Sequence, residues 1–246
     1  MKQPIFNRKN FTTAIVLYQN QDPRYIGTYT ASEAASYLHL APSTVRMWVF
    51  GTRDRTKRGA KSFESIVQPS ETGVRLLSFI NLVELHVLSA IRRHHRISLK
   101  KVRQSIAYIQ KAFNTKHPLA CQQLYTDGVD LFIDRFGELM NASNQGQMAI
   151  PEILQLYLQR IEWDERGWAY RLYPFARSSF SKSPKSISID PCISFGQPVL
   201  AGTGIPTAML AQRYVVGESI SELATDYGCE RLKVEEAIRY ELALVA

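Results

Sequence analysis

The sequence predicts a mainly α-helical protein with a small insert that mixes a helix and strands. Three observations favour this fold class. Helix-turn-helix patterns stand at both ends of the 246-residue chain, over residues 30–50 and 206–245. A long apolar stretch follows the first of them, and alternating, strand-like patterns gather in the middle. Apolar residues make up 45% of the chain and charged residues 21%, which is typical of folded domains.

We divide the chain into five expected segments. They are a winged helix-turn-helix domain (1–70), a helical hairpin that is a possible dimerisation element (71–117), a strand-rich insert (118–176), a serine-rich linker (177–186) and a three-helix domain with helix-turn-helix geometry (187–246). The polar composition of the fourth segment is typical of a linker.

The first helix-turn-helix begins with a capping box. Thr30 is placed to accept a hydrogen bond from the backbone of Glu33, whose side chain reaches back to Thr30. Small alanines on the buried face of this helix let a second helix cross closely. Pro42 disfavours helical geometry at the residue before it, so we expect the turn at residues 39–42. Ser43 is expected to cap the second helix.

The second helix of this motif has an apolar side and a polar side. Val45, Trp48 and Val49 face inward at helical spacing. The opposite side is the one that a recognition helix turns toward the major groove of DNA. The residues predicted there are Ser43, Thr44, Arg46 and Met47.

A basic, glycine-containing stretch follows and predicts a wing, with a short strand at 62–67. Residues 1–61 contain ten Lys or Arg and three acidic residues, a net charge of +7, and clustered cations are what DNA attracts. An ordinary helical hairpin without a nucleic-acid role is the alternative, but the wing favours DNA binding. The residues expected along the phosphates are Arg53, Arg55, Lys57 and Arg58.

The stretch "YTASEAASYL", followed by "STVRMW", a basic wing and a long helix, resembles the MerR-like winged helix-turn-helix over residues 30–113. The resemblance implies that Arg46, Arg53, Arg55 and Arg58 contact DNA and that the protein is a dimer. The chain departs from the family in its wing, which is longer and lacks the usual tyrosine-rich strands.

Two helices are expected after the wing. The stretch 76–94 is so broadly apolar that it predicts a helix buried on more than one side. Ser98 is expected to cap the next helix, whose apolar residues recur at steps of three and four. They are Leu99, Val102, Ile106, Ile109 and Phe113. This seam suits either packing within one chain or a homodimer interface, and we favour the dimer.

The insert predicts a hairpin around Asp127-Gly128, a helix over 150–158 and a second hairpin over 161–173. An acidic trio in it would suit a metal-dependent nuclease, but a turn and solvent-facing strand positions explain its members. The trio is Asp127, Asp130 and Asp134. Three aromatic residues are expected to fill a small core or a partner interface. They are Trp163, Trp168 and Tyr170.

The C-terminal segment predicts a short strand at 187–190, glycine- and proline-rich turns, and three helices. Its first helix, 206–216, is expected to bury Met209, Leu210 and Tyr214. A second capping box, Ser219 to Glu222, precedes a helix that Gly228 ends. The last helix is expected to pack through Val234, Ile238, Leu242 and Val245. From residue 187 onward the chain has four basic residues and eight acidic ones, a net charge of −4, so this segment would repel phosphates.

This segment resembles a small helical domain of VapB-type antitoxins. The resemblance rests on Asp190-Pro191, Gly196, Pro198, Gly202-Thr203, Ile205-Pro206 and Gly217-Glu218-Ser219. It implies a PIN-like ribonuclease toxin as the partner. Gly204 is a departure, because many relatives carry Arg there. The residues expected to contact the partner are Arg213, Tyr214, Glu218, Glu222, Asp226, Glu235 and Arg239.

The function that we predict is that of an antitoxin in a type II toxin–antitoxin pair, binding its operator as a homodimer and neutralising the toxin. The alternative is a ligand-responsive MerR-like regulator without a toxin. An enzyme is disfavoured because the chain lacks a nucleophile–base or metal pattern, and no cofactor or metal is expected. The three scattered cysteines, the polar start and the lack of a long apolar run favour a cytoplasmic protein with no membrane contact.

Overall fold

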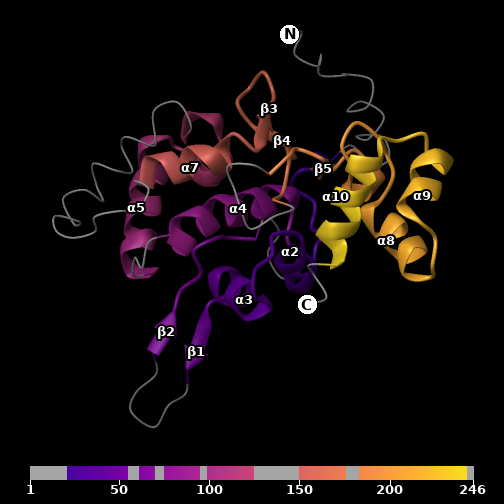
Figure 1. The fold of residues 1–246 in the computed structure, drawn as a ribbon. Helices are drawn as coiled ribbons and strands as arrows, with labels where there is room; N and C mark the ends of the chain where they lie inside the picture. The colour runs from indigo at the N-terminus through magenta and orange to yellow at the C-terminus, as the bar shows by residue number, and fades with distance from the viewer. Residues whose placement is uncertain are drawn as a thin grey trace.

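The computed structural model describes residues 21–54, 61–69, 75–94, 99–124, 150–175 and 183–242. Short helices surround one long central helix, and the three small antiparallel sheets have two strands each (Figure 1). This architecture confirms the expected fold class. The elements of the first half are α2 (Ala31–Tyr37), α3 (Pro42–Phe50), β1 (Thr52–Asp54), β2 (Lys61–Phe63), α4 (Phe79–His94), α5 (Leu99–Ala112) and η1 (Pro118–Ala120).

The second half adds a helix and a hairpin, and then the C-terminal domain. These elements are α7 (Ile150–Leu158), β3 (Ile161–Trp163), β4 (Ala169–Leu172), β5 (Ile187–Ser188), η4 (Ser194–Gly196), β6 (Val199–Leu200), α8 (Thr207–Val215), α9 (Ile220–Asp226) and α10 (Arg231–Leu242).

From Phe79 to Ile91 the central helix α4 is buried on every side, as its broad apolar pattern predicts. The polar residues of this stretch are buried as well, because each has a partner inside the protein. The carboxylate of Glu84 accepts hydrogen bonds from Asn81 (3.2 Å) and contacts the His117 ring 3.1 Å away. Burial raises the pKa of Glu84 above its ordinary value. The Asn81 amide also donates to the Gln68 carbonyl (2.7 Å), which ties the segment after the wing to α4.

The apolar seam of α5 packs inside its own chain. Val102 and Ile109 are fully buried, and Ile106 is nearly so. Leu99 and Phe113 are partly buried against the same core. The preference for a dimer interface along this seam is therefore wrong, because the side chains that would form it are already covered. A homodimer stays a prediction, and it would need another surface.

The described part of the insert holds the expected helix, α7, and the expected second hairpin, β3–β4. The turn between β3 and β4 has Gly167 at a φ of 75°. Trp163 packs against the main core, and the Tyr170 hydroxyl donates to Glu162 (2.8 Å). The first expected hairpin and the acidic trio, Asp127, Asp130 and Asp134, lie outside the described residues.

The C-terminal domain packs α8, α9 and α10 around a small core of Leu210, Leu223, Val234, Ala237 and Ile238, with Leu200 of β6. The expected glycine-rich turn between β6 and α8 is present, and so is the capping box at Ser219. Three expected core residues are exposed instead, and Val245 lies outside the described residues. The exposed ones are Met209, Tyr214 and Leu242. For Met209 and Tyr214 the reason is that α8 buries the neighbouring face, with Thr207, Leu210 and Ala211, against the rest of the domain.

The C-terminal domain is joined to the insert by backbone and side-chain contacts. Leu172, at the end of β4, exchanges two backbone hydrogen bonds with Ile189. Arg171 forms ion pairs with Glu162 (3.1 Å) and Asp190 (3.0 Å), one on each side of this junction. The expected linker is therefore folded at its end, where Ser186 is buried.

Arg160 holds this junction together. Its guanidinium donates to four carbonyls, and burial lowers its pKa to about 10. The acceptors are the carbonyls of Tyr173 (2.8 Å), Ser183 (2.7 Å), Pro174 (3.0 Å) and Pro184 (3.1 Å). The Arg160 guanidinium therefore links the start of the C-terminal domain to the insert.

We expect Arg160→Met to lower the free energy of unfolding by about 3 kcal/mol, since each buried acceptor left without a donor costs about 1–3 kcal/mol. Denaturant unfolding measures this change. Arg166→Met is the control, because Arg166 is exposed in the β3–β4 turn. Equal midpoints for the two variants would contradict the role of Arg160.

Candidate nucleic-acid interface

The pair α2 and α3 forms the predicted helix-turn-helix. The capping box of Thr30 and Glu33 is present, with both of its reciprocal hydrogen bonds. Ala34 and Ala35 are fully buried where α3 crosses, and Val45, Trp48 and Val49 of α3 face them from the other side of the core. The small side chains allow the close crossing that the motif requires.

The start of α3 differs from the prediction at Ser43. The N-cap is Ala41, without a capping side chain, and Pro42 occupies the first turn. Proline suits this position because its missing N–H would have no partner there. Ser43 therefore lies within the first turn of α3 and is exposed. The turn itself depends on His39, whose φ of 51° reverses the chain.

Fewer residues of α3 are exposed than the sequence predicted. Ser43 and Arg46 are exposed, and the Arg46 guanidinium donates to the Ser32 hydroxyl of α2 (3.3 Å). Thr44 is only half-buried. Met47 packs partly against the core, so the expectation that it points away from the core is wrong.

Two residues on this face were missed by the sequence reasoning. Phe50 is exposed and lies four residues after Arg46, on the same side of α3. The Arg75 guanidinium lies 5.7 Å from the centre of its ring, a cation–π contact that places a second arginine beside α3. The spacing of Ser43, Arg46 and Phe50 is a sequence signal for Phe50. No sequence signal places Arg75, which comes from beyond the wing.

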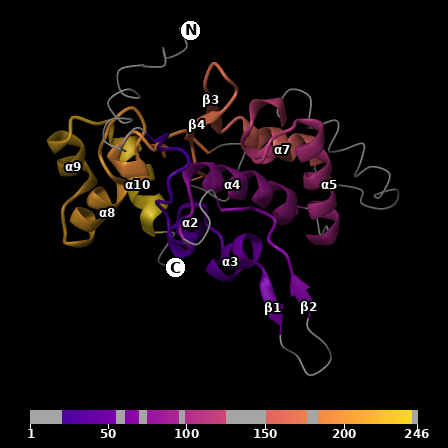
Figure 2. The same cartoon turned by 180° about the vertical axis from the view of Figure 1, so that it is seen from behind.

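The wing is a two-stranded hairpin, in which Arg53 of β1 pairs with Ser62 of β2. Figures 1 and 2 show β1 and β2 extending away from the helical body next to α3. The second strand covers Lys61–Phe63, shorter than the expected 62–67. Arg55, Lys57 and Arg58 lie outside the described residues.

The base of the wing is fixed to the helical body. The backbone amides of Ile66 and Val67 both donate to the Trp48 carbonyl at the core of α3. From α5, the Arg103 side chain donates to the Glu64 carbonyl (2.5 Å). These bonds set the position of the hairpin relative to α3, which a winged DNA-binding motif needs in order to contact groove and phosphates together.

The C-terminal domain lies directly against α2. The Tyr29 hydroxyl, at the start of α2, donates to the Gly196 carbonyl (3.0 Å). From α10, the Tyr240 hydroxyl donates to the Tyr37 carbonyl (2.8 Å), and its ring meets His39 edge to face at 5.1 Å. Nothing in the sequence signals these contacts, which join residues more than 160 positions apart.

All six charged residues that were expected to contact a partner have bonds within the C-terminal domain. Arg213 forms ion pairs with Glu218 and Asp226. Glu222 is the acceptor of the Ser219 capping box. The remaining pair, Arg239 and Glu235, forms an ion pair along α10 (2.6 Å).

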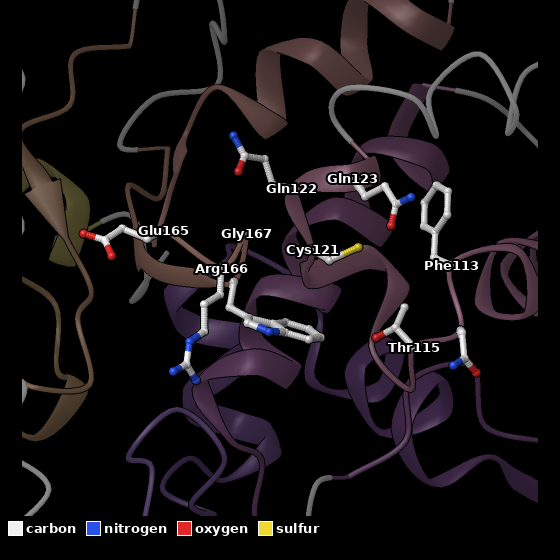
Figure 3. Close-up of a pocket in the computed structure, with 10 residues that line it drawn as sticks. Phe113, Thr115, Cys121, Gln122, Gln123, Glu165, Arg166 and Gly167 are labelled. Carbon is white, nitrogen blue, oxygen red and sulfur yellow. The ribbon is translucent and has the colours of Figure 1, made fainter.

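A hollow of about 540 Å³ opens between the end of α5 and the β3–β4 turn (Figure 3). Phe113 and Trp168 give it aromatic walls, which is the kind of lining that the ligand-responsive alternative requires. Figure 3 shows Cys121 and Glu165 pointing in different directions, so these two residues do not form a nucleophile and base pair.

Two family models match the chain. The model described as "Putative DNA-binding HTH domain" matches residues 27–106, which contain α2, α3, the wing, α4 and part of α5. The model described as "Protein of unknown function (DUF433)" matches residues 187–240, the C-terminal domain from β5 into α10.

The chain is also similar to proteins of Mycobacterium tuberculosis (strain ATCC 25618 / H37Rv). It is 27% identical to "Putative antitoxin VapB45" over 229 residues, which cover 85% of this chain and 92% of the relative. It is 23% identical to "Uncharacterized protein Rv2308" over 227 residues, with 86% and 89% covered. A crystal structure of Rv2018 from Mycobacterium tuberculosis has the same fold, with a TM-score of 0.66, 26% identity, and 87% and 98% of the two chains covered.

These similarities agree with the geometry of the interface. The chain carries a helix-turn-helix domain that matches the model described as "Putative DNA-binding HTH domain", and over most of its length it is similar to the protein named "Putative antitoxin VapB45". Within the described residues, no helix combines the length and the apolar composition that crossing a membrane requires.

Proposed function

We propose that this protein is the antitoxin of a type II toxin–antitoxin pair. It binds its operator through α3 and the wing as a homodimer, and its C-terminal domain binds and neutralises a PIN-like ribonuclease toxin. The observation that carries the proposal is the division of charge between two domains in contact: +7 over residues 1–61 and −4 from residue 187 onward.

The DNA-binding half of the proposal is supported by the helix-turn-helix geometry. The exposed face of α3 presents Ser43 and Arg46 beside the wing, and arginine is the residue that most often reads guanine in the major groove. Arg53, Arg55, Lys57 and Arg58 supply cations for the phosphate backbone. The MerR-like resemblance supports a dimer, which would present two α3 helices to a two-fold operator.

The toxin-binding half is supported by the acidic C-terminal domain. A ribonuclease binds a polyanion, so its active surface is expected to be basic. An acidic inhibitor then gains association rate and selectivity from electrostatic complementarity. The similarity to "Putative antitoxin VapB45" extends over this domain as well as the DNA-binding one, since it covers 85% of the chain.

The test is co-expression of this chain with the product of the adjacent reading frame. We expect the two proteins to co-purify and the RNA cleavage of the partner to be suppressed in the complex. We also expect the complex to shift the DNA upstream of its own gene. Failure to form a complex would remove the antitoxin role, whereas DNA binding without a complex would favour the ligand-responsive regulator.

A further inference from the structure

The C-terminal domain concentrates the exposed apolar side chains of the protein. Among the described residues, seven of the nine large hydrophobic side chains that are exposed lie between residues 195 and 242. Single exposed apolar residues are ordinary on any surface, but a concentration of them in one small domain is typical of a binding surface. The seven are Phe195, Met209, Tyr214, Val215, Val216, Leu232 and Leu242.

Three of the seven gather on the outward side of α8. Met209 is exposed at 43%, and Val215 and Val216 are exposed at 68% and 80%. Met209, Gln212 and Val216 recur at steps of three and four, so they share one side of the helix, and Val215 flanks it. We call Met209, Gln212, Val215 and Val216 the α8 face. The opposite side of α8, with Thr207, Leu210 and Ala211, is the side that packs within the domain.

Ion pairs and hydrogen bonds with neighbouring residues hold the α8 face in position, and acidic residues lie at its border. Arg213 forms ion pairs with Glu218 and Asp226, and its guanidinium lies 5.2 Å from the centre of the Tyr227 ring. The Tyr227 hydroxyl in turn donates to the Met209 sulfur (3.0 Å). One cation therefore meets two carboxylates at the edge of the face. The result is an apolar patch with an acidic rim, which is the composition of a protein interface.

The charge of the rim selects the kind of occupant. DNA and RNA would be repelled by the carboxylates, and a second copy of this chain would bring acidic rim against acidic rim. A basic protein with an apolar contact surface complements both features. Figure 2 shows α10 lying between α8 and α2, so helix α8 is on the side of the domain away from the helix-turn-helix. A protein bound there leaves α3 and the wing accessible.

We propose that the α8 face is the surface through which this protein binds its toxin. This inference rests on the proposed function and goes further, because it assigns the contact to apolar side chains. The sequence predicted that charged residues would contact the toxin. Among them, Arg213, Glu218 and Asp226 instead form the rim and keep the α8 face in place.

The test is the double variant Val215→Asn/Val216→Asn, measured as the affinity for the co-purified product of the adjacent reading frame. Both side chains are exposed, so the fold is retained. Asparagine removes apolar surface without changing charge. We expect affinity to fall by more than tenfold, because burial of one valine contributes about 1.5 kcal/mol. Operator binding and the thermal midpoint should stay unchanged.

Leu232→Asn is the matched control. Leu232 is 73% exposed and lies at the start of α10, on a different helix from the α8 face. Loss of binding in the double variant alone supports the α8 face. Retained binding in both variants, or equal loss in both, would overturn it. If the wild-type chain forms no complex, the proposed function fails and the inference falls with it, whereas a failure confined to the variants leaves the antitoxin role standing.

Discussion

Replacement of Arg46 by alanine is expected to weaken operator binding by about 10- to 100-fold. Arg46 is exposed on α3, and a good arginine contact with a base contributes about 1–3 kcal/mol of discrimination. Its present partner, the Ser32 hydroxyl at 3.3 Å, is a weak contact that DNA is able to replace. The measurement is a binding titration on the DNA upstream of the gene, repeated at several salt concentrations.

Arg231→Ala is the matched control for this prediction. It removes the same charge from an exposed position at the start of α10, in the acidic domain. We expect operator affinity to be unchanged in this variant and to fall steeply with added salt in the wild-type chain. Equal effects of the two substitutions would show that net charge alone governs binding and that α3 does not read the operator.

Replacement of Gly196 by alanine is expected to destabilise the protein by about 3 kcal/mol. A Cβ atom there would lie 2.2 Å from the Tyr29 hydroxyl oxygen, and the φ of 74° is unfavourable for any residue with a side chain. The left-handed conformation costs roughly 1–2 kcal/mol and overpacking of a core costs about 1–3 kcal/mol. Tyr29 is buried and stands next to the N-cap of α2, so the displacement reaches the DNA-binding motif.

Gly202→Ala separates the cost of the left-handed backbone conformation from the cost of the clash with Tyr29. Gly202 has a φ of 85°, and a Cβ atom there meets nothing within 4 Å. This variant should therefore lose only the roughly 1–2 kcal/mol of backbone strain. Denaturant unfolding gives the free energies of both. If the two variants are equally destabilised, the contact between Gly196 and Tyr29 contributes little, and the two domains are less tightly joined than the structure implies.

The local elements of this protein could be predicted because they depend on near neighbours. The capping boxes at Thr30 and Ser219 need only a hydroxyl and a glutamate three residues apart, and both are present. The inward side of α3 and the burial of α4 follow from apolar periodicity within one element. The turn before Pro42 follows from the covalent geometry of proline.

The candidate site was predictable only in part, for a reason that lies outside α3. Arg46 is exposed as its helical position predicts, but the side chain of Met47, the next residue, packs partly against the core. The pairing of Phe50 with Arg75 joins residues on either side of the wing. A pattern within one helix carries no information about a side chain that arrives from another element.

The sequence by itself determined where α2 and α9 begin, which domain is basic and which is acidic, because capping and charge are properties of short segments. The tertiary structure alone decided which apolar faces stay exposed. The α5 seam is covered by its own chain, whereas Met209 and Val215 of α8 and its C-cap Val216 remain open. Both stretches are apolar at helical spacing, and only the packing of other segments, η1 against α5 among them, decides which face is covered.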